Sequence, residues 1–121
     1  MLNDLNPHTC RSIYLACGYT DLRYGIDGLA GVVSENFHLN PFDKGTLFLF
    51  CGRRADRIKG VFWEGDGFLL LYKRLENGRF QWPRTPEEAR KMSPRQFRWL
   101  MEGLSIYQKR TVSEVSPTRI I

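Results

Sequence analysis

Cationic and aromatic side chains are concentrated between residues 51 and 83 of this 121-residue chain. A groove lined with cations and aromatic rings holds single nucleic-acid strands, because the cations attract phosphates and the rings stack on bases. Arginine-rich turns can equally contact the phosphates of a duplex. We therefore expect a nucleic-acid-binding surface that consists of Arg53, Arg54, Arg57, Lys59, Lys73, Arg74, Arg79, Trp63 and Trp82.

The same stretch has a second interpretation that the sequence leaves open. Phe62, Phe68 and Phe80, with at least one tryptophan, would then fill the hydrophobic core. The cations would be solvated surface residues that keep a small protein soluble.

The charge of the chain is unevenly distributed. The formal net charge is +5, from 18 lysine and arginine residues against 13 aspartate and glutamate residues. Twelve of the 18 cationic residues lie between positions 51 and 99, together with six of the 13 acidic residues. This concentration of positive charge favours binding to a polyanion.

A catalytic alternative rests on three carboxylates in the same region, Asp56, Glu64 and Asp66. In metal-dependent nucleases, clustered carboxylates hold Mg²⁺ against the scissile phosphate. However, no acidic residue is followed two positions later by lysine, and turn formation alone explains residues 64–67 (EGDG). No local Ser-His-Asp or Cys-His signature is present. We therefore expect a non-enzymatic protein and keep a metal-dependent nuclease as the less favoured alternative.

The cysteine and histidine residues do not follow a pattern typical of a metal site. Cys10, Cys17 and Cys51 form no CxxC pair, and His8 and His38 lie far apart in the sequence. Structural zinc is usually held by close-spaced pairs of ligands. We therefore expect reduced thiols, and neither a metal nor another cofactor.

The N-terminal residues MLNDLNPHTC contain no cationic segment followed by an apolar one, as a secretory signal would. No apolar run approaches the roughly 20 residues of a membrane-spanning helix. We therefore expect a cytoplasmic protein that has no membrane partner.

Several short segments have the composition and periodicity of strands. Residues 11–16 favour a strand, and the continuous apolar run 46–51 is typical of a central strand buried on both faces. Residues 57–63 alternate, so one face begins with Arg57 and Lys59 and ends with Trp63. Turns at 64–67 and 77–78 predict that strands over 68–75 and 79–82 complete a three-stranded meander.

Helices are predicted on both sides of these strands. Thr20 is expected to cap a helix whose apolar face is formed by Leu22, Ile26, Leu29, Ala30, Val33 and Phe37. Start signals at Thr85-Pro86 and Ser93-Pro94 predict a short helix to about residue 91 and a second helix that ends near residue 103.

We therefore predict an α+β fold, a mostly antiparallel sheet of about five strands with one N-terminal helix and a C-terminal helical pair packed on it. Residues 1–106 are expected to form a single domain, and residues 107–121 a flexible C-terminal tail. Gly25, Gly28 and Gly31 lie along one ridge of the first helix, where we expect a sheet or another helix to pack closely. Neither phosphate-binding glycine motif is present.

Three motifs follow one another along the chain: GYTDLRYGIDGLAGVV at residues 18–33, LFLFCGRRADRIK at 47–59 and FWEGDGFLLLYKRLENGRFQWP at 62–83. In this combination the chain resembles the TnpB accessory proteins of insertion sequences of the sixty-six type. These small proteins are encoded beside the transposase and are unrelated to the RNA-guided nucleases that share their name. The resemblance extends over residues 13–105.

The resemblance implies an accessory role in DNA transposition, with DNA, the transposase and other proteins of the same element as partners. It brings no set of catalytic residues. The positions that match the family are Asp21, Arg23, Gly25, Asp27, Gly28, Arg53, Arg54, Asp56, Arg57, Lys59, Trp63, Asp66, Gly67, Lys73, Arg74, Gly78, Phe80, Trp82 and Pro83.

Two functional hypotheses follow. In the first, a non-catalytic accessory protein binds nucleic acid through the basic and aromatic hairpin surface and assists the transposase. In the second, the protein is an adaptor whose tryptophans and tail dock the transposase without direct contact to nucleic acid.

Overall fold

A mixed β-sheet forms the centre of the molecule in this computed structural model, which describes residues 10–85 and 89–108. Within these ranges the strands are β1 (Ser12–Ala16), β2 (Thr46–Cys51), β3 (Arg57–Trp63), β4 (Phe68–Arg74) and β5 (Ala89–Met92). The helical segments are α1 (Ile26–Gly31), the π-helical turn η2 (Val32–Asn36) that continues it, and α2 (Pro94–Met101).

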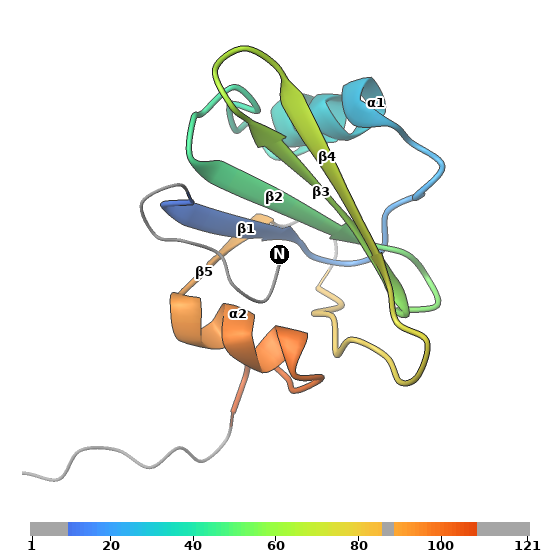
Figure 1. Cartoon of the computed structure of the whole chain (residues 1–121). Coiled ribbons are helices and arrows are strands. Elements are labelled where there is room, and N and C mark those ends of the chain that lie inside the picture. The colour runs from blue at the N-terminus through green and yellow to red at the C-terminus, as the bar shows by residue number, and fades with distance from the viewer. Residues whose placement is uncertain (1–9, 86–88, 109–121) are drawn as a thin grey trace, which may run out of the picture.

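The five strands lie in the order β4-β3-β2-β1-β5. The neighbours β1 and β2 are parallel, with Leu15 opposite Leu49, and every other neighbouring pair is antiparallel. A tight turn cannot join parallel neighbours, because the chain must return to the end from which it started. Residues 17–45 make this return and contain α1 and η2 (Figure 1).

The predicted architecture, a mostly antiparallel sheet with an N-terminal helix and a C-terminal helical pair, is wrong. The sheet is mixed, α1 lies between β1 and β2 in the sequence, and a single helix, α2, follows the last described strand. Where the sequence predicted the first helix of the pair, Ala89–Met92 form β5 instead. These residues pair with the edge of β1, and this tertiary pairing overrides the local helix signal.

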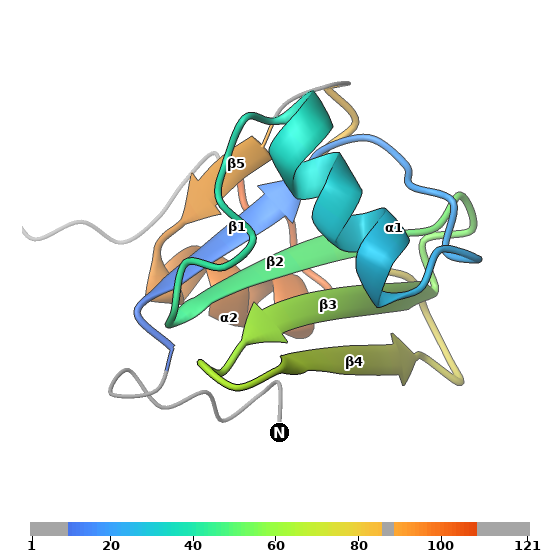
Figure 2. The ribbon, with the colours of Figure 1, turned by 90° about the horizontal axis from the view of Figure 1, so that it is seen from above.

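The two faces of the sheet are covered by different helices, α1 on one side and α2 on the other (Figure 2). Leu29 and Val33 pack with Phe48 and Phe50 on the α1 side. The core on the α2 side contains Leu15, Leu47, Leu49, Ile58, Phe97 and Leu100. All six residues of β2 are buried, which confirms the prediction of a central strand covered on both faces.

Helix α1 begins six residues after the predicted cap, Thr20. The Asp21 carboxylate accepts a hydrogen bond from the backbone N–H of Arg23 (3.0 Å), and the Tyr24 N–H donates to the Asp21 carbonyl (3.2 Å). Such local bonds compete with helix formation. Residues 21–24 therefore form a turn between β1 and α1 instead of the first turn of a helix.

Residues 75–83 run past the ends of the strands and do not form the predicted third strand of the meander. The Leu75 N–H donates to the Asp56 carbonyl, and the Phe80 N–H donates to the Ala55 carbonyl, both at 2.7 Å. Phe80 and Trp82 are buried while their neighbours Arg79 and Gln81 are exposed. The predicted alternation is present, but the backbone bonds go to the loop between β2 and β3.

The start of α2 agrees with the sequence. Ser93 caps the helix, its hydroxyl accepts from the Gln96 N–H (3.1 Å), and the Gln96 side chain accepts from the Ser93 N–H (3.0 Å). The predicted tail falls mainly on residues 109–121, which lie outside the described residues, and the domain boundary at 106 stays a prediction. No helix in the described ranges is long and apolar enough to cross a membrane.

Candidate nucleic-acid interface

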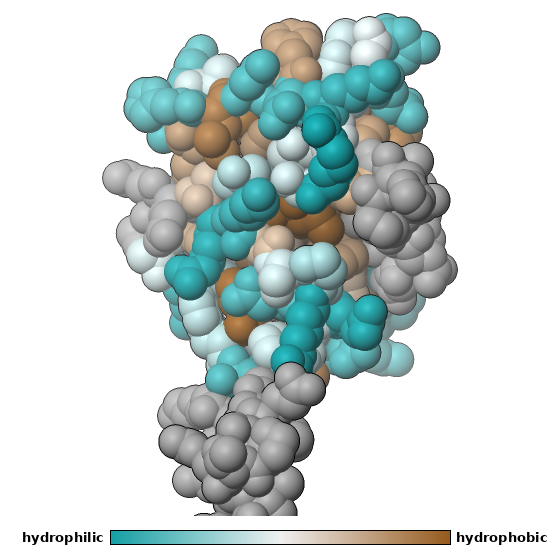
Figure 3. Space-filling view, turned by 90° about the vertical axis from the view of Figure 1, so that its left-hand side faces the viewer, coloured by the Kyte–Doolittle hydropathy of each residue, from teal (hydrophilic) through white to brown (hydrophobic). Residues whose placement is uncertain are grey.

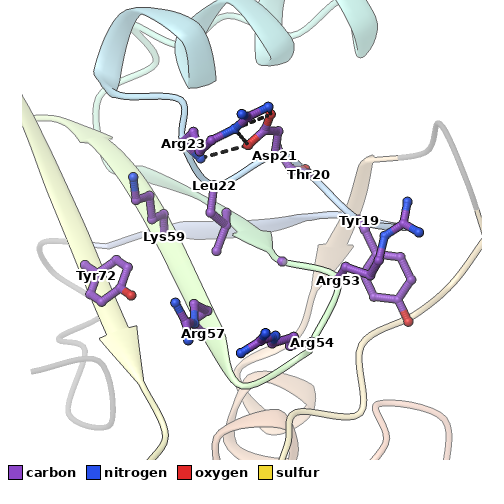
Figure 4. Close-up of a pocket in the computed structure, with 11 residues that line it drawn as sticks. Tyr19, Thr20, Asp21, Leu22, Arg23, Arg53, Arg54, Arg57, Lys59 and Tyr72 are labelled. Carbon is purple, nitrogen blue, oxygen red and sulfur yellow. Dashed lines mark hydrogen bonds and ion pairs between the residues drawn. The ribbon is translucent and has the colours of Figure 1, made fainter.

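Four predicted site residues line one hollow of about 570 Å³, which we call the basic hollow (Figure 4): Arg53, Arg54, Arg57 and Lys59. Its lining residues are Tyr19, Thr20, Asp21, Leu22, Arg23, Gly52, Arg53, Arg54, Arg57, Lys59 and Tyr72. The loops that follow the parallel strands β1 and β2 supply most of them. In open sheets with parallel strands, ligands usually bind outside the carboxyl ends of the strands.

The turn between β2 and β3 positions Arg53 and Arg54. It is closed by the Gly52 N–H, which donates to the Arg57 carbonyl (3.2 Å), and by the Ala55 N–H, which donates to the Gly52 carbonyl (3.0 Å). Ala55 has a φ of 59°, in the left-handed region that few residues with a side chain adopt. The backbone of this turn is therefore closely constrained, and the guanidinium groups of both arginines project from it.

Arg53 and Arg54 are exposed, and within the described part of the chain neither makes an ion pair or a hydrogen bond through its guanidinium group. Arg57 differs, because its Nε lies 3.2 Å from the Asp56 carboxylate. Lys59 also has a partner, since its Nζ donates to the Tyr24 carbonyl (3.0 Å) and so links β3 to the start of α1. The two turn arginines are thus the lining cations with the least internal compensation.

Asp21 and Arg23 form an ion pair at the rim of the hollow, with 2.7 Å between Asp21 Oδ2 and Arg23 Nη2. The Arg23 hydrogen bonds lower the pKa of Asp21 to about 2. The carboxylate therefore remains ionised at neutral pH and offsets the charge of Arg23. Arg23 adds little net positive charge to the basic hollow.

A second hollow of about 400 Å³ adjoins the first, because Tyr19, Arg53 and Arg54 line both. Arg79 and Arg84, both exposed, supply its other cations. The structure therefore brings six of the nine predicted site residues to two adjoining hollows: Arg53, Arg54, Arg57, Lys59, Arg79 and Trp82.

Lys73 and Arg74 lie outside both hollows. Lys73 is paired with Ile58, so its side chain lies on the α2 face of the sheet, opposite to Arg57 and Lys59. Arg74 shares the α1 face with Arg57, its partner across the ladder, but its guanidinium group binds Glu76 at 3.0 Å.

The two predicted tryptophans have different surroundings, and neither lines the basic hollow. Trp63 lies at the far end of β3, where its ring packs against Phe42 and Phe68 at centroid distances of 5.0 and 4.9 Å. Trp82 is 5% exposed and its Nε1–H donates to the Ala16 carbonyl (2.8 Å). The Trp82 ring is part of the core, so we leave it out of the proposed interface.

The groups that a catalytic mechanism would need are dispersed. Asp56 precedes β3 and pairs with Arg57, whereas Glu64 and Asp66 follow the other end of that strand. Among the described residues no three His, Cys, Asp or Glu side chains are grouped to hold a metal ion. Burial, with a smaller effect of Asp56, raises the pKa of Cys51 to about 12, so this thiol stays protonated near neutral pH.

Seven residues that line the basic hollow were not among the predicted site residues: Tyr19, Thr20, Asp21, Leu22, Arg23, Gly52 and Tyr72. Tyr19 follows Gly18, whose N–H donates to the Pro83 carbonyl (2.8 Å), and the Thr20 N–H donates to the Cys51 carbonyl (2.9 Å). These hydrogen bonds join three chain segments that are distant in the sequence, so no local sequence pattern predicts them. The half-buried Leu22 packs against the α1-side core as expected, but it precedes the helix and lies against Gly52.

By fold and site this is a small mixed-sheet protein with a cationic hollow at the carboxyl ends of its parallel strands. A family model described as IS66 Orf2 like protein matches residues 11–111. The chain belongs to this family, as the resemblance of its motifs predicted, and is an accessory protein associated with transposition.

Two relatives from Sinorhizobium fredii are similar to much of the chain. The uncharacterized protein y4hO is 41% identical over 92 residues, which cover 76% of this chain and 79% of the relative. The uncharacterized protein y4jC is 31% identical over 116 residues, which cover 96% of this chain and 98% of the relative. No solved structure matches the chain.

Proposed function

We propose that this transposition accessory protein is non-catalytic and binds nucleic acid through the basic hollow. The observation that carries the proposal is the position of Arg53 and Arg54 at the boundary of two cationic hollows, exposed and without a carboxylate partner in the described ranges. A phosphate that approaches them displaces water and counterions only, and breaks no internal ion pair.

Arg57 and Lys59 extend this cationic surface along β3 toward β4. Arg57 is paired with Asp56, but exposed or half-exposed ion pairs contribute little to stability, so exchange of the carboxylate for a phosphate costs little. The bond from Lys59 to the Tyr24 carbonyl leaves its charge uncompensated. With Arg53 and Arg54, these residues give a row of cations able to follow a phosphodiester backbone.

The proposal is tested by the salt dependence of DNA affinity, measured by fluorescence anisotropy between about 50 and 200 mM salt. If about five duplex phosphates are neutralised, log K should fall with log salt at a slope near −4.5. In the double variant Arg53→Ala/Arg54→Ala, loss of two phosphate contacts should weaken binding and make the slope less steep by about 1.8.

The matched control is Lys91→Ala/Arg98→Ala, which removes the same charge from exposed positions on β5 and α2 outside both hollows. We expect this control to retain most of the affinity and the original slope. Equal losses in the two double variants would mean that only net charge matters. That result, or no DNA binding at low salt, would overturn the proposal.

An adaptor role is the second candidate, and the cluster of Phe42, Trp63 and Phe68 favours it. Phe42 is 55% exposed although its ring packs on both neighbours, so an apolar surface is available there. Figure 3 shows the face on the left of Figure 1, where apolar areas are separated by hydrophilic side chains. Apolar surface on that face is therefore divided into small areas, and we place the adaptor role second.

The adaptor role is tested by binding of purified transposase in the absence of DNA. Phe42→Ser should weaken that binding, whereas Leu104→Ser, at a residue 41% exposed and outside the cluster, should not. If the two proteins associate only when DNA is present, the adaptor role is excluded.

A further inference from the structure

Two exposed tyrosines lie at the ends of the row of cations in the basic hollow. Figure 4 shows Tyr72 at one end and Tyr19 at the other, with Lys59, Arg57, Arg54 and Arg53 between them. Tyr72 is 53% exposed and Tyr19 is 42% exposed. A ligand that offers only phosphates would be bound by the cations and would need no exposed aromatic rings beside them.

Tyr72 is held on the rigid part of the molecule. It lies on β4, the edge strand, directly opposite Lys59 on β3, and the Lys59 Nζ is 5.9 Å from the centre of its ring. The helix formed by α1 and η2 crosses the sheet from β3 toward β1 and leaves β4 uncovered (Figure 2). The ring therefore lies beside a cation on a part of the sheet that is open to a ligand.

Tyr19 is held by the backbone on either side of it. The bonds of Gly18 to Pro83 and of Thr20 to Cys51 fix the residues before and after it. Its side chain lines the basic hollow and the second hollow, beside Arg53. Between the two tyrosines the lining is completed by Leu22, an apolar side chain of the α1-side core.

From this arrangement we propose that the ligand of the basic hollow is single-stranded DNA, with its phosphates on the arginines and unpaired bases stacked on Tyr72 and Tyr19. The inference rests on the proposed function and specifies its ligand. A duplex keeps its bases stacked on one another and exposes phosphates and groove edges, so it would leave both rings unused. A single strand offers base faces and phosphates together.

The test compares the affinity for a single-stranded oligothymidine of about 12 nucleotides with the affinity for the duplex that this strand forms with oligoadenosine. Both are measured by fluorescence anisotropy at the same salt concentration. Because stacking on one aromatic ring contributes about 1–3 kcal/mol per base, Tyr72→Ala should weaken binding to the single strand by roughly 5- to 150-fold. Tyr19→Ala should act in the same direction, and both variants should leave duplex affinity unchanged. Tyr72→Phe keeps the ring and should bind like the unsubstituted protein.

Tyr24→Ala is the matched control, since Tyr24 is 46% exposed but does not line the basic hollow. Thermal unfolding of each variant shows whether it is folded. If the single strand and the duplex bind equally and no tyrosine variant differs from the control, the inference is overturned. In that case binding that still depends on salt and on Arg53 and Arg54 would leave the proposed function standing, whereas no binding of either DNA would overturn both.

Discussion

At the scale of single residues, Arg53 and Arg54 differ from the other arginines of the basic hollow because no carboxylate in the described ranges offsets their charge. Arg23 is 90% exposed, yet Asp21 neutralises it through two side-chain oxygens. Arg57 and Arg74 also have acidic neighbours within 3.2 and 3.0 Å. The number of arginines near a hollow therefore overstates its net positive charge.

The Asp21 ion pair leads to a pH prediction. The pKa of Asp21 is about 2, below its ordinary value of 3.8, chiefly because the Arg23 side chain donates hydrogen bonds to the carboxylate. Since the Asp21 pKa is lower in the folded state than in the unfolded state, the ion pair stabilises the folded protein fully above about pH 4. This contribution to stability is lost as the pH falls toward 2. In a carboxyl NMR titration, Arg23→Gln should raise the Asp21 pKa toward 3.8.

Lys59→Gln is the control for that titration, because Lys59 lowers the Asp21 pKa only through a small long-range effect. It should change the Asp21 titration less than Arg23→Gln does. An Asp21 pKa that is already ordinary in the unsubstituted protein would show that the pair does not form in solution.

Single residues also show how far the sequence could locate the site. Arg57 and Lys59 were expected on one face of a strand, and the register confirms this. The same period of two places Lys73 and Arg74 on opposite faces of β4, so one surface cannot include both. Alternation in the sequence identifies which residues share a face of a strand. Which of the two faces is buried is decided by how the strand pairs with its neighbours in the sheet.

At the scale of secondary-structure elements, Trp82 shows the limit of reading an alternating pattern as a strand. Residues 79–82 alternate in burial as predicted, yet the Phe80 N–H bonds to the Ala55 carbonyl in a loop. Alternation requires an extended backbone with one buried side, and it does not specify a neighbouring strand. The position of β5 was likewise set by the free edge of β1, a partner more than 70 residues earlier in the sequence.

The glycines of the first helix were expected to mark close packing, and the structure gives a different picture. A Cβ atom on Gly31 would meet no described atom within 4 Å, whereas a Cβ on Gly28 would lie 3.0 Å from the Cβ of Tyr24. Gly31 also has helical backbone angles, with φ at −62° and ψ at −40°. The freedom of glycine is therefore not needed at Gly31.

We accordingly predict that Gly31→Ala stabilises the protein by about 0.5–1 kcal/mol, because alanine restricts the unfolded chain and fits the helix. Urea unfolding of the two variants measures this effect. Gly28→Ala is the comparison and should give a smaller gain or a loss, since Tyr24 must move. A destabilised Gly31→Ala variant would indicate that this position is covered by a contact outside the described residues.

At the scale of the whole molecule, the charges are separated on either side of residues 19–21. On one side are the two cationic hollows. On the other, a hollow of about 610 Å³ beside α1 is lined by Asp21, Asp27 and Glu35 and by no lysine or arginine. A polyanion is repelled from this acidic side and attracted to the basic one, so the charge distribution orients an approaching DNA strand.

The central claim is that DNA contacts the loops at the carboxyl ends of β1 and β2. The most direct test is a DNA titration followed by backbone amide NMR, which reports on every part of the folded chain at once. We predict that the largest shift changes fall on residues 19–23 and 52–59, with smaller changes on α2. Changes confined to α2, or to the cluster of Phe42, Trp63 and Phe68, would contradict the claim.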